Sequence, residues 1–389
     1  MCKEFCKNRK LGAFIVPTGV GASIGGYAGD ASTWARRFAE VSTLIVNPNV
    51  VNAGGFSGIT ENMLYVEGYS LDEFFKGNIG LVPSAKNKVG VVFDKGISEA
   101  VLNIHINTIN AVKTVYDLDI IYEVTQKVLE TDFFVDLSGI STGKINNIET
   151  ILKSAKNLLS QGAEAVAIVC KFKDDNQNTA YESGIGVDPI GGLEAIISHY
   201  ISKELRVPAA HAPAFEDFSI STKIVDPKSA SEYITPTFLP CILIGLSQAP
   251  RIVAKQREKK EKNKWKMENG KWKIFCSLLT AHCSLLKPFI LSHQNDSLLL
   301  TVSDLDFLVM PYNSLGSVPV FEAIKRGIKV FAVKENQTVL NVTKNSLLLD
   351  KIIEINTYQE CLNKIIKTPV EKITTEGELA ERKNKISLC

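Results

Sequence analysis

The sequence predicts an α/β protein with mostly parallel, Rossmann-like sheets flanked by helices and glycine-rich loops that meet at a central cleft. Short apolar runs alternate with helix-length amphipathic stretches, which is the pattern of consecutive βαβ units. A glycine-rich segment directly follows the first apolar run. The chain has 389 residues, of which 45% are hydrophobic and 22% charged, so its composition is that of a globular protein and excludes a disordered or collagen-like chain.

The first βαβ unit occupies the first fifty residues. Residues 11–16 form an apolar run of the length of a buried strand, and the glycine-rich loop covers 17–30. We expect a helix over 31–40, capped by the side chain of Asp30, because a carboxylate can accept hydrogen bonds from the free amides of a first helical turn. A second strand is expected over 42–46.

The alternation continues to the end of the chain. The further strands are expected at 88–93, 120–124, 163–170, 207–210, 305–310, 329–333 and 352–355. The further helices are expected at 98–116, 148–161, 188–205, 320–326 and 358–367. Asp188 precedes a proline and is predicted to be the N-cap of its helix, because proline is favoured at the first helical position.

The length predicts two domains or one large α/β unit. We place an N-terminal α/β domain at 11–135 and a C-terminal α/β domain at 136–367, followed by a flexible tail at 368–389. Residues 254–294 interrupt a βαβ run where a short loop would suffice, and we interpret them as an atypical, dispensable insert or an error of the gene model.

Charge is concentrated around this insert. Residues 251–273 contain ten Lys or Arg and three Asp or Glu, whereas the formal charge of the whole chain is only +2. Trp265 and Trp272 lie within the basic run, as in some nucleic-acid-binding segments, but a charge block of this length is more typical of a solvated, irregular insert. We therefore expect no nucleic-acid partner.

No motif indicates a metal site or a membrane span. The eight cysteines lack the Cys-x-x-Cys spacing of zinc sites, and no apolar run reaches the ~18 residues that a transmembrane helix requires. We expect no membrane partner. The start of the chain shows no signal peptide or transit peptide, so the expected location is the cytoplasm or the plastid stroma.

The glycine-rich loop is the first candidate site. Thr18, Gly19, Gly21, Gly25 and Gly26 would let a ligand approach the backbone closely, and amides entering a helix favour an anion. The spacing resembles a dinucleotide fingerprint, but the second strand ends in Asn47 rather than in the acidic residue that would hold a ribose. The glycines fit an anion, a dinucleotide or simple tight packing. In the first case Gly25→Val should abolish ligand binding while the fold is retained.

The second candidate site contains Asp188 and His211. His211 follows the strand predicted at 207–210, and ligands gather at the carboxyl ends of parallel strands. A histidine at this place suits acid–base chemistry near neutral pH, and it suits equally well a structural hydrogen bond within a loop.

The third candidate site combines two loops that leave consecutive strands. Ser314, Gly316 and Ser317 precede a helix, where amides suit a phosphate or carboxylate. Glu335 and Asn336 follow the next strand and would orient the ligand or accept a proton. Ordinary polar loops explain the same residues. We predict that Gly21, Gly25, His211, Ser314 and Asn336 line one shared cleft.

Seven blocks in this sequence resemble domain-of-unknown-function family 3326, which is found in cyanobacteria and plastid-bearing eukaryotes. The blocks lie at 16–30, 47–52, 64–69, 186–189, 211–213, 237–241 and 335–338. The resemblance covers about residues 11–367 and departs from the family pattern at 254–294. It implies no established activity.

The residues together suggest binding of a small anionic metabolite. Thr18, Gly19, Gly21, Gly25, Gly26, Asn47, Ser314, Gly316, Ser317 and Asn336 are the candidate ligand-binding residues. His211, Glu335 and Asp188 are the candidate catalytic residues for acid–base chemistry. The alternative is a non-catalytic ligand sensor or assembly factor of photosynthetic lineages, and the sequence assigns no cofactor, no reaction and no oligomeric state.

Overall fold

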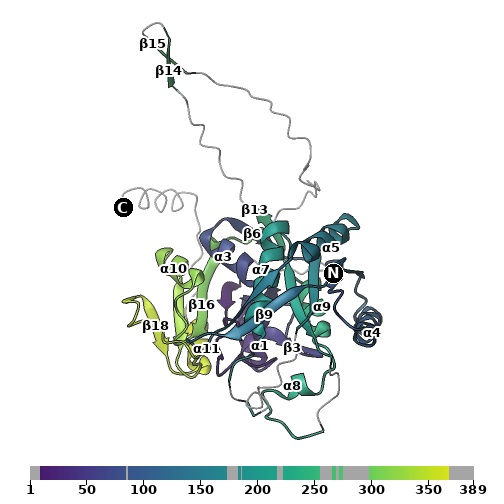
Figure 1. Cartoon of the computed structure of the whole chain (residues 1–389). Coiled ribbons are helices and arrows are strands. Elements are labelled where there is room, and N and C mark those ends of the chain that lie inside the picture. The colour runs from purple at the N-terminus through teal and green to yellow at the C-terminus, as the bar shows by residue number, and fades with distance from the viewer. Residues whose placement is uncertain are drawn as a thin grey trace.

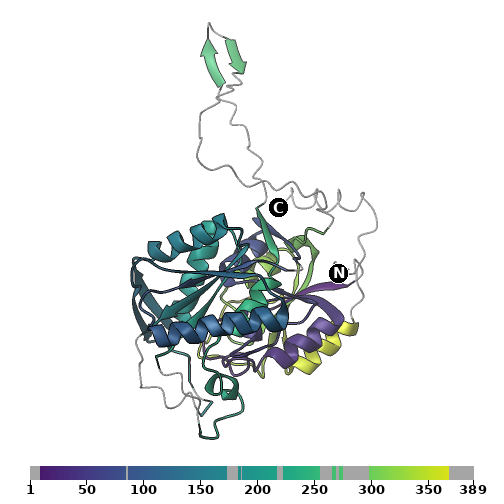
Figure 2. The same ribbon diagram turned by 90° about the vertical axis from the view of Figure 1, so that its right-hand side faces the viewer.

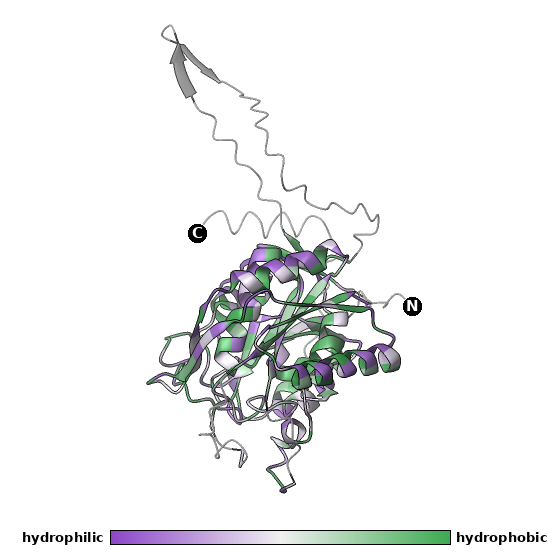
Figure 3. Cartoon of the chain, turned by 45° about the vertical axis from the view of Figure 1, so that its right-hand side comes forward, coloured by the Kyte–Doolittle hydropathy of each residue, from purple (hydrophilic) through white to green (hydrophobic). Residues whose placement is uncertain are grey.

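Two parallel β-sheets with helices on both faces form the framework of the protein (Figure 1). The computed structural model describes residues 9–84, 86–172, 183–184, 186–216, 222–254, 265–268, 271–274 and 298–367. The predicted α/β class with mostly parallel sheets is confirmed. Hydrophobic residues fill the strands, whereas the outer helices mix hydrophobic and hydrophilic residues (Figure 3).

The larger sheet has six parallel strands in the order β18-β17-β16-β1-β2-β5. Their bounds are β1 Lys10–Phe14, β2 Ser42–Val46, β5 Met63–Tyr65, β16 Leu305–Pro311, β17 Lys329–Val333 and β18 Ile352–Ile355. Both faces of this sheet are covered. Phe14 of β1 packs into one core cluster and Ala13 into the other. This explains why the strands are continuous apolar runs rather than alternating ones.

Two pairs of helices cover the two faces of the six-stranded sheet. Helices α1 (Ser32–Val41) and α11 (Tyr358–Lys367) pack side by side on one face (Figure 2). The rings of Phe14 and Tyr358 meet there edge to face at 5.2 Å. Helices α3 (Gly68–Lys76) and α10 (Val318–Lys325) pack together on the other face.

The smaller sheet has four parallel strands in the order β12-β11-β7-β8. Their bounds are β7 Val89–Phe93, β8 Ile120–Val124, β11 Ala165–Lys171 and β12 Ala209–Ala214. Helices α5 (Glu149–Ser160) and α7 (Gly191–Leu205) supply the core cluster on one face. Helix α4 (Glu99–Tyr116) covers the other face together with α9 (Leu239–Ser247).

Helix α9 joins the two sheets. It is buried along nearly its whole length, and it contacts β11 and β12 of the smaller sheet as well as the segment that follows β2. As a result, a single core cluster contains Phe14 of the larger sheet, Val91 of the smaller sheet and Leu243 of α9. The two sheets therefore share one hydrophobic core.

Short elements complete the described chain. The helical ones are α2 (Pro48–Val51), α8 (Ala230–Tyr233) and the 3₁₀ turn η1 (Val302–Asp304). The antiparallel strand pairs are β3 (Asn52–Ala53) with β4 (Phe56–Ser57), β6 (Ile79–Val82) with β13 (Arg251–Ala254), β9 (Glu130–Val135) with β10 (Ser141–Asn146), and β14 (Trp265–Glu268) with β15 (Lys271–Ile274). None of the helices in the described ranges combines the length and the apolar character needed to cross a membrane.

Several expectations from the sequence need correction. The boundary predicted between residues 135 and 136 does not separate the sheets, because strands from both sides of it pair in each sheet. Asp30 does not cap α1, because its carboxylate accepts a hydrogen bond from the amide of Gly25 instead. The tail at 368–389 and most of the insert at 254–294 lie outside the described residues.

Candidate functional site

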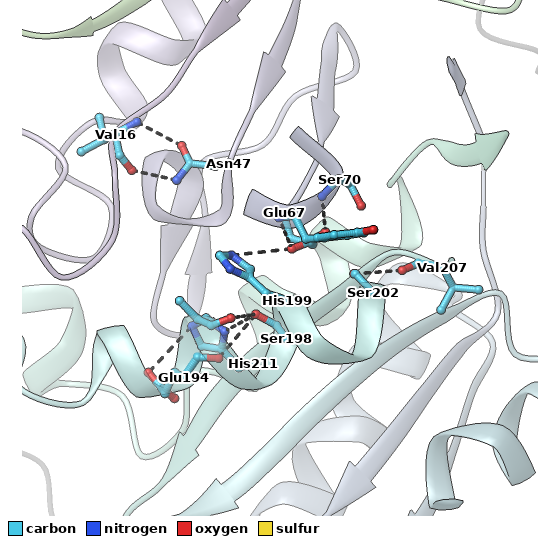
Figure 4. A network of polar contacts seen from close by, with 12 residues as sticks. Val16, Asn47, Glu67, Ser70, Glu194, Ser198, His199, Ser202, Val207 and His211 are labelled. Atoms are coloured by element: carbon cyan, nitrogen blue, oxygen red, sulfur yellow. Dashed lines mark hydrogen bonds and ion pairs between the residues drawn. The ribbon is translucent and has the colours of Figure 1, made fainter. Parts of the chain in front are cut away.

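A cleft of about 440 Å³ lies between the carboxyl edge of the six-stranded sheet and helix α7. Its first wall is made by the segments that follow β1, β2, β5 and β16, which contribute Thr18, Asn47, Glu67 and Ser317. Its second wall is made by α7 and β12, and residues of α8 and α9 close one side. Figure 4 shows the polar network of the second wall and its contact with the first.

Asparagines that follow β2 hold the glycine-rich loop in place. The side chain of Asn47 is buried, accepts a hydrogen bond from the Val16 amide at 3.1 Å and donates one to the Val16 carbonyl at 2.7 Å (Figure 4). Asn49 donates to the Gly25 carbonyl at 2.6 Å. Asn47 thus lines the cleft as predicted, but its amide group is engaged in clamping the loop.

The glycines of this loop divide into two groups. Thr18, Gly19, Gly21 and Gly26 line the cleft, whereas Gly25 is not among its lining residues. Gly25 has φ +91°, and a Cβ atom at this position would lie 2.9 Å from the side chain of Val16. Gly25 therefore serves the turn and the packing of the loop.

Helix α7 and strand β12 place three polar side chains together. His211 lies within β12 rather than after it, which corrects the predicted end of that strand at residue 210. Its Nδ1 lies 3.0 Å from the hydroxyl oxygen of Ser198, and its Nε2 lies 3.9 Å from Oε2 of Glu194 (Figure 4). The Glu194 side chain is 6% exposed, and its Oε1 has no hydrogen-bond partner among the described residues.

The hydrogen bonds assign the tautomer of His211. The hydroxyl of Ser198 has two carbonyl oxygens to which it can donate, that of Ala195 at 3.1 Å and that of Glu194 at 3.4 Å, so we assign it as the acceptor of Nδ1–H of His211. The Nε2 atom then carries the lone pair and faces Glu194. Burial lowers the pKa of His211 to about 3, with a smaller contribution from His199. Burial raises the pKa of Glu194 well above its usual value.

A second pair, which sequence reasoning missed, connects the two walls. Glu67 caps α3 by accepting hydrogen bonds from the amides of Tyr69 and Ser70 at 2.8 and 2.7 Å. The same carboxylate lies 3.7 Å from Nε2 of His199 on α7 (Figure 4). His199 lies in a helix, and nothing in the local sequence indicates that it faces the cleft. Glu67 directly follows a short apolar strand, and this position at a strand end could have identified it as a candidate site residue.

Asp188 lines the cleft, but its carboxylate is engaged in a hydrogen bond with the backbone. Its carboxylate accepts a hydrogen bond from the amide of Ile190 at 3.0 Å, and burial raises its pKa. Helix α7 begins at Gly191 with Ile190 at the N-cap position, so the predicted N-cap at Asp188 is wrong by two residues. Nevertheless, its carboxylate binds an amide immediately before the helix.

Most residues of the third candidate site predicted from the sequence hold the fold together and do not line the cleft. Ser317 lines the cleft, but Ser314, Gly316, Glu335 and Asn336 are not among the lining residues. Asn336 is fully buried, and its side chain binds both backbone polar groups of Ile24 and donates to the hydroxyl of Tyr358 at 2.6 Å. Glu335 accepts from the amide of Tyr358 at the start of α11. The shared cleft predicted from the sequence therefore contains Gly21 and His211 but not Gly25, Ser314 or Asn336.

The described lining of the cleft is acidic. Its carboxylates belong to Glu67, Asp72, Asp188, Glu194 and Glu232, and its basic side chains are the two histidines, with no Lys or Arg among the described lining residues. Within the described ranges, no group of three or more His, Cys, Asp or Glu side chains has the arrangement of a metal site.

The fold and the cleft define the class of protein: an α/β protein with two parallel sheets, one shared core and a polar cleft at the carboxyl edge of the larger sheet. The chain belongs to the family described as "Protein of unknown function (DUF3326)", whose model matches residues 12–275 and 277–371.

A cyanobacterial relative supports this assignment. An uncharacterized lipoprotein of Synechococcus sp. is 34% identical over 333 residues, which cover 84% of this chain and 82% of the relative. No solved structure matches the chain.

Proposed function

We propose that this protein binds a small polar molecule in the cleft. The observation that carries the proposal is the position of the cleft at the carboxyl edge of the six-stranded sheet. From β5 to β18, the strands of this sheet are third, second, first, fourth, fifth and sixth in chain order. Ligands of doubly wound, Rossmann-like sheets with this order bind outside the carboxyl ends of the strands, where the order reverses. Thr18 and Ser317, from the segments after β1 and β16, line the cleft at that point.

The ligand in this proposal is polar rather than anionic. The described lining offers an anion no Lys or Arg, and two of the helix N-termini at the cleft are already occupied by carboxylates of the chain. Glu67 accepts from the first amides of α3, and Asp188 accepts from the amide that precedes α7. These amides would otherwise have been the natural anion sites.

A second candidate function is acid–base catalysis by Glu194 and His211. The observation in its favour is that burial moves the pKa values of these neighbouring groups in opposite directions. Such a separation assigns acid and base roles in known enzymes. Glu194 would hold the proton and His211 would present an unprotonated Nε2, although a pKa of about 3 makes that nitrogen a weak base. This weakness favours ligand binding as the primary function.

The binding proposal is tested by filling the cleft. Ala195 lines it, so Ala195→Phe should remove binding of small molecules to the full-length protein. Ala100→Phe, on the exposed side of α4, is the matched control. Ligand-observed NMR with a fixed library of polar metabolites should detect molecules that bind the wild type and the control but not Ala195→Phe. Equal binding to all three folded proteins would show that the ligands bind elsewhere.

Catalysis is then separated from sensing with His211→Gln. We expect an enzyme to convert one of the bound metabolites, as followed by mass spectrometry, and this variant to retain binding while losing the conversion. Unchanged conversion in His211→Gln would exclude the catalytic pair, and binding without conversion by the wild type would favour the sensor.

A further inference from the structure

We propose that the ligand of the cleft carries a protonated amine and that Glu194 binds this ammonium group together with Nε2 of His211. This inference rests on the proposed function, because it names the chemical class of the molecule bound there. Its starting point is an unmatched pair of hydrogen-bond acceptors in the second wall of the cleft.

The acceptors are Oε2 of Glu194 and Nε2 of His211. They are 3.9 Å apart, which is too far for a hydrogen bond between them, and Nδ1–H of the imidazole is already donated to Ser198. Oε1 of Glu194 also has no hydrogen-bond partner among the described residues. A buried polar group without a partner is costly, so this arrangement requires a donor.

An ammonium nitrogen satisfies both acceptors at once. Placed at about 2.8–2.9 Å from each of them, it makes two ordinary hydrogen bonds and directs a positive charge at the carboxylate. An alcohol offers one hydrogen for the two acceptors, and a carboxylate offers none. The geometry therefore selects an amine over its neutral and anionic counterparts.

The remaining charges favour the same ligand. Three other carboxylates of the lining are held by backbone amides: Glu67 at α3, Asp188 before α7, and Glu232, which accepts from Ala28 at 2.6 Å. No Lys or Arg of the described lining balances them. Glu194 lies among Asp188, Glu232 and Cys170, with His211 as its neighbour on β12, so a ligand cation would relieve repulsion rather than add to it.

A proton competes with the cation for the carboxylate of Glu194. Burial and the neighbouring carboxylates Asp188 and Glu232 raise the pKa of Glu194, which favours the protonated form of its carboxyl in the empty cleft. Where the carboxyl is protonated, binding is an exchange: the carboxyl loses H⁺ to the solvent and the resulting carboxylate receives the ammonium. Affinity for the amine should increase with pH, by up to about tenfold per unit while one proton is exchanged.

Matched probes test this proposal on the full-length protein. Butylammonium, butanol and butyrate form one series, and benzylammonium, benzyl alcohol and benzoate form another. Dissociation constants are measured by NMR titration at pH 6, 7 and 8. We expect the ammonium member of at least one series to bind tenfold or more tightly than its two counterparts, with an affinity that increases with pH.

Variants assign the effect to Glu194. Glu194→Gln keeps the size of the side chain but loses its charge, so it should abolish both the preference for ammonium and the pH dependence. Glu149→Gln is the control, because Glu149 is also in the first turn of a helix but is exposed, and it should behave as the wild type. Ala195→Phe, which fills the cleft without touching the charge, should weaken all bound probes.

The outcomes separate the two proposals. Tighter binding of butanol, butyrate or their aromatic counterparts, lost in Ala195→Phe, would overturn the amine inference and leave the binding cleft standing. Ammonium binding that persists in Glu194→Gln would also overturn the inference. Binding of no probe, or binding that Ala195→Phe leaves intact, would overturn both.

Discussion

At the scale of single residues, the polar side chains of this protein serve two different purposes that look alike in the sequence. Asn336 and Asn47 are buried amides whose donors and acceptors bind the backbone of the glycine-rich loop. Glu194 is a buried carboxyl with an oxygen that has no partner among the described residues. A satisfied amide stabilises the fold, whereas a buried carboxyl oxygen without a partner needs an explanation, and the one that we propose is a ligand.

Replacement of Gly25 tests the structural role of the loop. Gly25→Ala forces a side chain into a backbone with φ +91° and places its Cβ 2.9 Å from Val16. We expect the free energy of unfolding to fall by about 1–3 kcal/mol, as measured by urea denaturation. The Gly25→Val variant, predicted from the sequence to retain the fold, should be destabilised further, because its branched side chain adds more atoms to the same crowded space.

Gly162 provides the control for this measurement. It has the same φ of +91°, but a Cβ there would meet no atom of the described residues within 4 Å. Gly162→Ala therefore reports the backbone cost alone, and the additional loss in Gly25→Ala reports the contact with Val16. Equal losses in the two variants would show that crowding at Gly25 is unimportant.

At the scale of elements, α9 determines how the two sheets are held together. It is a short helix that is buried nearly all round, and it belongs to the core cluster that contains residues of both sheets. A helix that is hydrophobic on every side is stable only when it is enclosed on every side. The cleft lies against this helix, which contributes Cys241 and Ile242 to its lining.

Truncation of a buried α9 side chain should destabilise the whole protein. Leu243 is 0% exposed, and Leu243→Ala should lower the free energy of unfolding by about 2–5 kcal/mol through lost burial and a residual cavity. Leu137→Ala, in an exposed position between β9 and β10, should change it by less than about 0.5 kcal/mol. A single shifted transition in thermal melting would confirm a shared core. Two separated transitions for Leu243→Ala would contradict it.

At the scale of the whole molecule, the chain leaves the larger sheet after β5 and returns to it at β16, far along the sequence. Leu11 of β1 pairs with Leu305 of β16, and the four-stranded sheet is formed by the residues between them. Residues 256–296, which include most of the basic run, lie in this long connection, and the chain on both sides of them is held by the same strand. Residues 251–254 pair with β6, and Leu300 forms a bridge with Leu81 of β6.

This arrangement predicts that the segment can be shortened. Replacing residues 256–296 with a flexible Gly-Ser linker should preserve the fold, because both flanks stay paired with β6 and the entropy of loop closure changes by only about 0.6 kcal/mol per doubling of length. Thermal melting should give a midpoint close to that of the wild type. A replacement that begins at residue 251 also removes β13 and should melt at a lower temperature. Loss of the folded state in the first variant would show that the segment is required.

The sequence by itself determined the parallel α/β class and every strand of the two parallel sheets except β5, whereas it did not indicate the short antiparallel pairs. Strands β1, β2 and β16 are buried along nearly their whole length, so each contains a mainly apolar run without the polar alternation of a half-exposed strand, and such a run can be recognised from the local sequence. The local sequence also predicted that His211 and the start of the glycine-rich loop lie at the candidate site, because residues near strand ends gather at the carboxyl edge of a parallel sheet.

Only the tertiary structure decided which polar residues face the cleft and which form hydrogen bonds that hold loops in place. Glu335 and Asn336 follow a strand as a ligand-binding pair would, but their partners are Tyr358, which lies 22 residues beyond Asn336, and Ile24, which lies 312 residues before it. Glu194 and His199 lie inside a helix, where neither carries a local sign that it lines the cleft. The physical reason is that an apolar run reveals its burial through its own composition, whereas the role of a polar group is set by the partner that folding brings to it, or fails to bring.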